Sequence, residues 1–306
     1  MTNKIDNANL DENLLVTVAM PVYNGAQFLT EAIESILAQS MKSFEFIVID
    51  DGSSDASLEI LKKYRDIDPR IKVFSRENRG VVFTRNELIE RSAGKFIAWM
   101  DQDDISLPDR LIKQVELMER TNADICGCHW IVINEDGKFI DTRLVPLETD
   151  SFVICLAETV PFAHGSVMIR RQFAIEKSLR YGSRRYAEDY DLWIRFFEAG
   201  ADFVNVNDFL FKYRDYSTSL SKRKIQELMS DTRALKLGFM KRNSGICVDS
   251  ITKLSKRTRS LSLFERVNLV IASFRLSKLT KSLLFVETIK SSNRRSVVTA
   301  LFELLR

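Results

Sequence analysis

Long hydrophobic runs and regularly spaced cysteines are both missing from this chain. No apolar stretch approaches the roughly 18 residues that a membrane-spanning helix needs, and no signal-peptide core follows Met1. The four cysteines are sparse and irregular, which favours reduced, structural thiols over a disulfide framework. We therefore expect a cytoplasmic globular protein whose residues 1–13 form a flexible, polar N-terminus.

The common phosphate-binding loops are missing as well. A dinucleotide-binding Rossmann site needs a Gly-x-Gly-x-x-Gly turn after the first strand, and here that turn has only Gly25. The chain has no Walker A sequence either. If the protein handles phosphate groups, a metal ion is therefore the expected means.

Charge is present but unevenly divided. Residues 222–306 contain 19 Lys and Arg against 6 Asp and Glu, a net charge of +13. Residues 1–221 contain 26 basic and 36 acidic residues, a net charge of −10. Such asymmetry indicates two functional parts, the second of which we expect to be a basic helical C-terminal region over 222–306.

Short apolar strands alternate with amphipathic helices through the first 120 residues. The pattern predicts strands at 16–20, 44–49, 71–74 and 96–100, and helices at 27–39, 57–65, 82–91 and 108–120. This order predicts an α/β fold with a mostly parallel sheet flanked by helices. Ligands bind such sheets where the strands end. Three strand ends carry polar residues: Pro21-Val22-Tyr23-Asn24, Asp50-Asp51 and Asp101-Gln102-Asp103.

The pattern changes after residue 121. We predict a hairpin over 124–133 and 138–144, a strand at 166–169 and a helix at 189–199. Beyond residue 221 the chain reads as basic helices. One of these has an apolar face formed by Leu263, Val267, Val270 and Phe274. That face could pack on the preceding domain or lie on an anionic membrane surface.

Asp-x-Asp triplets begin at Asp66, Asp101 and Asp189. The first precedes Pro69 and fits a solvated turn. The second ends a buried strand, where paired carboxylates suit a hard divalent cation that also binds substrate phosphates. The third opens a helix, where acidic residues also complement the helix dipole. The second triplet is therefore the stronger candidate for a metal site.

Five segments resemble, in order, the motifs of the family 2 glycosyltransferases, which have the GT-A fold. They are residues 16–24, 47–55, 78–86, 99–104 and 187–193. The resemblance covers residues 14–221, with a nucleotide-sugar-binding half at 14–120 and an acceptor half at 121–221. It implies transfer of a sugar, expected to be UDP-linked, to a glycan or lipid-linked acceptor of surface polysaccharide assembly.

The resemblance also implies which residues bind the donor. Those implied are Pro21, Tyr23, Asn24, Asp50, Asn78, Arg85, Asn86, Asp101 and Gln102. Asp101 would face the ribose, and Asp103 would hold Mn²⁺ or Mg²⁺. Asp50 suits a nucleobase because a carboxylate accepts a hydrogen bond from a uracil N–H.

The acceptor side is implied in the same way. Asp189 would be the general base, assisted by Glu188, because an attacking hydroxyl must lose its proton. A single base opposite the leaving group implies direct displacement with inversion. His164 and Trp193 would lie near the acceptor with Glu188, although a loop position and a core position are the respective alternatives.

One residue departs from the family pattern. Many relatives have a histidine near the metal or diphosphate where this chain has Tyr216. Tyrosine is a poor neutral ligand for Mg²⁺ or Mn²⁺. Either Asp103 and the donor phosphates hold the metal alone, or Asp215 contributes.

Two other functions remain open at this point. A nucleotidyltransferase also uses paired aspartates, but it usually carries a glycine-rich loop with Arg and Lys near its N-terminus. A non-catalytic subunit could keep the fold, although the acidic motifs are intact. We expect no nucleic acid partner, because the basic region lacks a recognised module. Loops at 140–165 and 178–188 are expected to set specificity.

Overall fold

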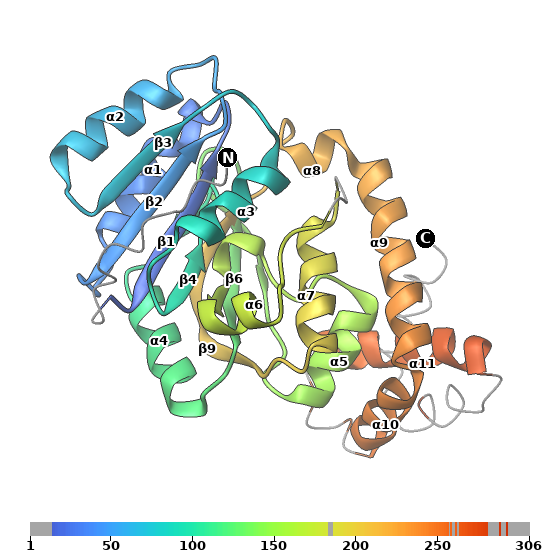
Figure 1. Ribbon diagram of the computed structural model, residues 1–306. Helices are drawn as coiled ribbons and strands as arrows, with labels where there is room; N and C mark the ends of the chain where they lie inside the picture. The colour runs from blue at the N-terminus through green and yellow to red at the C-terminus, as the bar shows by residue number, and fades with distance from the viewer. Residues whose placement is uncertain are drawn as a thin grey trace, which may run out of the picture.

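The computed structural model describes residues 14–182, 186–256, 258, 261, 263–280, 288 and 292 (Figure 1). Nine strands are described: β1 (Val16–Val22), β2 (Phe44–Asp50), β3 (Ile71–Ser75), β4 (Phe96–Trp99), β5 (Ile105–Ser106), β6 (Ile125–Ile133), β7 (Phe139–Arg143), β8 (Met168–Arg170) and β9 (Phe203–Arg214). They form one sheet in the order β3-β2-β1-β4-β8-β6-β9-β5, with β7 paired to β6.

Helices cover this sheet and extend beyond it. The first six are α1 (Ala26–Leu37), α2 (Ser57–Ile67), α3 (Val81–Arg91), α4 (Arg110–Thr121), α5 (Thr149–Glu158) and α6 (Arg171–Glu176). The rest are α7 (Glu188–Glu198), α8 (Leu220–Arg223), α9 (Ile225–Arg242), α10 (Ser244–Ser255) and α11 (Leu263–Thr280), with a 3₁₀ turn, η1, at His164–Ser166. The predicted α/β class, a mostly parallel sheet flanked by helices, is confirmed.

The first half of the sheet is parallel, as predicted. β1 pairs in parallel with both β2 and β4, and β2 pairs with β3. Every residue of β2 is buried, as expected for a strand covered on both faces. The predicted end of the first strand before Pro21 was wrong, because β1 continues to Val22. Proline is tolerated at this position because β4, the neighbour on one side of β1, pairs with β1 only as far as Ala19. Pro21 therefore costs the ladder between β1 and β4 no hydrogen bond.

The second half of the sheet is mixed. The predicted hairpin is present as β6 and β7, while β8 runs antiparallel to β4 and to β6. Two helices were missed, α5 and the short α6, and α5 lies inside the segment 140–165 that we expected to be a loop. Eight of its residues, from Ser151 to Glu158, are buried. Its sequence is apolar on nearly every side, so it carries no amphipathic signal.

The C-terminal helices pack against the acceptor half (Figure 1). Phe239 of α9 meets Phe197 of α7 edge to face at 5.4 Å. Arg275 of α11 pairs with Glu158 of α5. Val270 of α11 is fully buried, which supports packing over membrane contact for the apolar face of this helix. In the described part of the chain, no helix combines the length and the hydropathy that crossing a bilayer requires.

Candidate active site

Three aspartates occupy the turn after β4. Burial, reinforced by the charge of Asp101, raises the pKa of Asp103 to about 6. Burial and the charges of Asp103 and Asp101 also raise the pKa of Asp104 well above its usual value. The turn therefore gathers three carboxyl groups, whose oxygen atoms are the ligands that a hard divalent cation prefers.

His164 lies beside this turn. Its Nδ1 is 3.3 Å from each carboxylate oxygen of Asp101, and its Nε2 is 2.7 Å from the hydroxyl oxygen of Tyr181. Only 8% of the residue is exposed. His164 therefore connects the strand end to the segment that precedes α7, on the side where an acceptor is expected.

Two residues that the sequence reasoning missed make this approach possible. A Cβ on Gly165 would lie 3.1 Å from Asp101 Oδ2 and 2.7 Å from the Phe211 ring, so a larger residue would push the two segments apart. Arg110 is fully buried and donates to the carbonyl oxygens of Trp99 and Gly165. Arg110 thus ties η1 to the end of β4.

Arg85 bridges the donor and acceptor sides. Its guanidinium donates to Glu188 Oε1 at 2.5 Å and to Asp101 Oδ1 at 3.3 Å. Burial opposes its charge, but the carboxylates of Glu188 and Asp101 outweigh burial and raise the pKa of Arg85. Burial would likewise raise the pKa of Asp101, but His164 and Arg85 hold it below its usual range. We therefore expect a fixed positive charge between two carboxylates.

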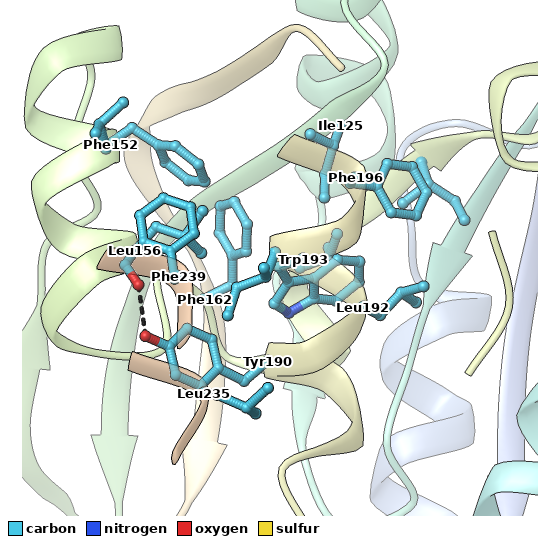
Figure 2. Close-up of a cluster of buried hydrophobic side chains, with 14 of the residues drawn as sticks. Ile125, Phe152, Leu156, Phe162, Tyr190, Leu192, Trp193, Phe196, Leu235 and Phe239 are labelled. Atoms are coloured by element: carbon cyan, nitrogen blue, oxygen red, sulfur yellow. Dashed lines mark hydrogen bonds between the residues drawn. The ribbon is translucent and has the colours of Figure 1, made fainter. Parts of the chain in front are cut away.

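The start of α7 presents Glu188 and Asp189. Ala187 precedes them with a left-handed φ of 59°, which turns the chain sharply into the helix. Asp189 Oδ1 accepts a hydrogen bond from the Tyr190 N–H at 2.7 Å. The Tyr190 hydroxyl donates to the Leu156 carbonyl oxygen inside the core, which anchors this turn (Figure 2). Burial raises the pKa of Glu188 despite its pairing with Arg85.

Trp193 does not lie where an acceptor could touch it. Its side chain is fully buried and meets Phe162 edge to face at 5.9 Å (Figure 2). The indole also stacks on His164 at 6.1 Å. The expectation of direct acceptor contact is therefore corrected, because Trp193 supports the position of His164 from within the core.

Asn86 is also a supporting residue. Its amide donates to the Tyr181 carbonyl oxygen at 2.9 Å and accepts from the Tyr181 N–H at 2.8 Å. The N–H and the oxygen of the Asn86 amide thus both hold the backbone of Tyr181, whose hydroxyl contacts His164. The contact of Asn86 with the nucleotide stays a prediction.

The strand ends expected to hold the nucleotide do meet. Gln102 Oε1 accepts from the Tyr23 N–H at 2.8 Å, which joins the turns after β1 and β4. Asn24, with a φ of 50°, accepts from the Ser54 N–H at 2.8 Å, which joins the turns after β1 and β2. Tyr23 is 50% exposed, so its ring is available to a ligand.

Asp50 is enclosed, contrary to the expectation that it binds a base. It is 1% exposed and accepts from the Ser75 hydroxyl at 2.8 Å and from the Ser53 N–H at 3.2 Å. The neighbouring Asp51, which was not singled out, accepts from the N–H groups of residues 79 and 80 and so shapes the loop before α3. Asn78 of this loop is exposed, whereas Pro21 is half-buried within β1.

Tyr216 lies against the expected metal residue. Its hydroxyl donates to Asp103 Oδ2 at 2.8 Å, and its ring meets Phe28 edge to face at 5.1 Å. The other candidate, Asp215, forms an ion pair with Lys222 at 3.0 Å. The position where relatives have a histidine therefore holds a hydrogen-bond donor to Asp103.

Arg214, which was also missed, fixes the backbone of the same turn. Its N–H donates to Asp104 Oδ1 and its Nε to the Asp103 carbonyl oxygen, each at 2.8 Å. The guanidinium lies 4.5 Å from the centre of the Phe28 ring. The end of β9 thus holds the aspartate turn by both backbone and side chain.

The residues present fit a cation that a donor diphosphate helps to hold. Among the described residues, no three His, Cys, Asp or Glu side chains are grouped as a complete metal site. Mg²⁺ and related ions, however, commonly use one or two carboxylates together with substrate phosphates. Asp103 and Asp101 supply such carboxylates in one turn, and this donor set fits a hard divalent cation.

Comparison with solved structures defines the class of protein. S. aureus TarS 1-349 in complex with UDP matches with a TM-score of 0.62 and 16% identity, over 90% of this chain and 88% of that one. A mannosyltransferase from Pyrobaculum calidifontis, in complex with GDP-Man and Mn²⁺, matches with a TM-score of 0.56 and 16% identity, over 94% and 87%. At these identities the likeness shows the fold, which is the GT-A fold of glycosyltransferases.

Sequence comparison then gives the family. The family model described as "Glycosyl transferase family 2" matches residues 17–179. A Bacillus subtilis protein named as a glycosyltransferase, EpsE, is 36% identical over 68% of this chain and 76% of its own length. Bacillus subtilis TuaG, named as a teichuronic acid biosynthesis glycosyltransferase, is 30% identical over 69% and 82%. The chain belongs to glycosyl transferase family 2.

Proposed function

We propose that this glycosyltransferase moves a sugar from a nucleotide-sugar donor, expected to be UDP-linked, to a hydroxyl of a glycan or lipid-linked saccharide, with inversion. The bridge formed by Arg85 between Asp101 and Glu188 is the observation that carries this proposal. It brings the end of the donor-side strand and the start of the acceptor-side helix to one site. A donor and an acceptor can therefore meet there.

The proposed reaction is a single displacement. Asp189 takes the proton of the acceptor hydroxyl as its oxygen forms a bond to the anomeric carbon. The bond from that carbon to the diphosphate oxygen breaks at the same time, and the electron pair leaves with the diphosphate. Arg85 holds the Glu188 carboxylate close to Asp101, and His164 lies beside the same aspartate.

Mn²⁺ or Mg²⁺ is the proposed cofactor. Asp103 would hold it, with Asp101 nearby and the donor diphosphate completing the ligands. When bound, the cation offsets the charge that develops on the leaving diphosphate. Tyr216 and Arg214 act on the position of Asp103, since one donates to its carboxylate and the other to its carbonyl oxygen.

The biological setting is proposed from the relatives. TuaG is named for teichuronic acid biosynthesis, which supports a role in surface polysaccharide assembly. TarS has been solved with UDP-GlcNAc, which supports a UDP-linked hexose or N-acetylhexosamine as the donor sugar. We place the reaction in the cytoplasm, with peripheral contact to the inner face of the plasma membrane through residues 222–306.

A thermal-shift screen with UDP-, GDP- and dTDP-sugars, each with and without Mn²⁺, tests the donor. We expect a Mn²⁺-dependent rise in melting temperature with a UDP-sugar, followed by sugar transfer or slow donor hydrolysis. Pyrophosphate release from UTP and a sugar phosphate would instead indicate a nucleotidyltransferase. Metal-dependent UDP binding without transfer or hydrolysis would indicate a non-catalytic subunit.

A further inference from the structure

Helix α9 has an inner face that packs on the enzyme. Leu235 and Phe239 of this face are at most 5% exposed and belong to the core that also contains α7 side chains, and Met240, close to the C-terminal end of the helix, is buried in the same core. Beside the ring contact of Phe239, Arg242 donates to Glu198 Oε1 at 2.8 Å. The helix is therefore fixed to α7, the helix that begins with the proposed catalytic carboxylates.

The outer face of α9 is also apolar in part. Met229 is 63% exposed and Leu237 is 43% exposed. At about 100° per residue, Met229, Arg233, Leu237 and Lys241 lie within roughly a third of the helix circumference. We call these four residues the α9 outer stripe. All four are exposed, and α9 lies on the right of the molecule in Figure 1.

The charge of this stripe has one sign. Arg233 and Lys241 alternate with the two apolar residues, and no carboxylate lies between them on the exposed arc. The acidic residues of α9 are Glu227 and Asp231, which lie to the side of it. Glu227 is paired with Lys224 at 3.3 Å. The exposed Arg223 adds positive charge just before the helix, whereas Lys222 is paired with Asp215.

We propose that the α9 outer stripe binds the surface of a bilayer that contains anionic lipids. Apolar side chains that alternate with cations suit this surface, because the former enter the headgroup region while the latter meet lipid phosphates. The stripe is distinct from the apolar face of α11, where Val270 is buried within the protein. A nucleic acid would leave Met229 and Leu237 without a favourable environment.

The position of the stripe has a consequence for the acceptor. Because α9 is fixed to α7, a bilayer against the stripe holds Glu188 and Asp189 in a constant orientation relative to the lipid surface. That arrangement suits an acceptor whose saccharide is attached to a membrane lipid. This consequence rests on the proposed transfer reaction, and the stripe narrows the membrane contact proposed above for residues 222–306 to one face of α9.

Vesicle co-sedimentation of the full chain tests the proposal. The probes are vesicles of phosphatidylcholine alone and of phosphatidylcholine with phosphatidylglycerol. We expect binding only to the second kind, weakened by added salt because the attraction is partly electrostatic. The double variant Met229→Glu/Leu237→Glu should lower the partition coefficient at least about tenfold, since it removes the apolar contacts and adds repulsion.

The matched control is Ile67→Glu. Ile67 is 64% exposed at the end of α2, far from α9 in Figure 1, and its replacement should leave vesicle binding unchanged. A second test variant, Arg233→Glu/Lys241→Glu, removes the cations without touching the apolar residues. Unaltered melting temperatures show that each variant is folded.

Equal binding by wild type and both double variants, or no binding of the wild type to anionic vesicles, overturns the proposal. Wild-type binding to neutral vesicles at the same strength does so too. Vesicle binding is measured without substrates. An inactive protein that binds vesicles through the stripe therefore refutes only the proposed function, and an active protein that ignores vesicles refutes only this inference.

Discussion

The hydroxyl of Tyr216 donates a 2.8 Å hydrogen bond to Asp103 Oδ2, which joins the end of the last strand to the proposed metal residue. The Tyr216 ring is itself held edge to face against Phe28. Groups that hydrogen-bond to a metal-binding carboxylate fix its orientation and raise metal affinity. Tyr216 is therefore suited to position Asp103 without binding the ion itself.

We predict that Tyr216→Phe weakens Mn²⁺ binding to the UDP complex roughly tenfold, because the Asp103 carboxylate loses its orienting donor. Titration of Mn²⁺ followed by electron paramagnetic resonance measures this affinity directly. Tyr213→Phe, the same change in the preceding part of β9, is the matched control. Equal Mn²⁺ affinity in the two variants would contradict the positioning role.

Asp189→Asn should reduce kcat about 10²- to 10⁴-fold, because the amide cannot accept the acceptor proton. UDP affinity, measured by calorimetry, should be unchanged, since the residue lies on the acceptor side. Asp191→Asn is the control on the same helix: its carboxylate accepts from Arg195 Nε at 2.9 Å. Normal turnover by Asp189→Asn would sink the proposed mechanism.

Asp103→Ala should lower sugar transfer at least about 10²-fold by removing the main protein contact to the cation. A chelator should produce a similar loss in the wild-type enzyme and little further loss in the variant. Transfer rates measured with and without added Mn²⁺ show whether the substitution and the chelator remove the same contribution of the cation to the rate. Full chelator sensitivity in the variant would place the cation elsewhere.

Arg85→Ala should lower the free energy of unfolding by about 3–5 kcal/mol, because two partly buried carboxylates lose their shared cation. Adding Glu188→Gln should recover part of that loss, since one uncompensated charge is then removed. Arg91→Ala breaks an exposed pair with Glu87 in the same helix, and it should cost less than about 1 kcal/mol. Urea denaturation measures all three. Similar losses for Arg85→Ala and Arg91→Ala would argue against the buried bridge.

Glu158 should make stability depend on pH. Burial, only partly offset by Arg275, raises the pKa of Glu158 to about 7 from its usual value of 4.5. The folded state therefore keeps this proton to higher pH than the unfolded state does. The resulting stabilisation is complete below about pH 4.5 and is lost as the pH rises towards about 7.

Glu158→Gln should remove this dependence. The difference in unfolding free energy between variant and wild type should change by roughly 1–3 kcal/mol between about pH 5 and pH 8. Glu119→Gln, at an exposed carboxylate of α4, should leave the pH profile as it is. A pH-independent difference for Glu158→Gln would show that the group ionises normally in the folded protein.

Much of the fold followed from local patterns. The first four strands and their helices were predicted within a few residues, because the strands are short apolar runs and the helices have an apolar period of about 3.6. The segment that forms α5 lacked such a period, so it was expected to be a loop. The direction of β8 and the pairing of β6 with β9 depend on contacts between distant segments. Local sequence does not encode such contacts.

The candidate active site was also predicted only in part from the sequence. The acidic residues at the end of β4 could be identified from the sequence because they end a buried apolar strand, and those at the start of α7 because the segment resembles a family motif. The residues that hold these acidic residues in place could not be identified from the sequence. Asn86 and Trp193 were expected to touch substrates, but the first holds the Tyr181 backbone and the second lies in the core.

The sequence by itself determined the βα order, the chemistry available at the strand ends and the charge asymmetry of the two parts, because these depend on residue type and local spacing. Tertiary structure alone decided that Arg85 joins Asp101 to Glu188 and that Tyr216 meets Asp103. The residues of each pair are far apart in the chain. Arg85 is 16 positions from Asp101 and 103 from Glu188, and Tyr216 is 113 positions from Asp103. Such contacts arise only when the packing of the sheet and helices brings their elements together.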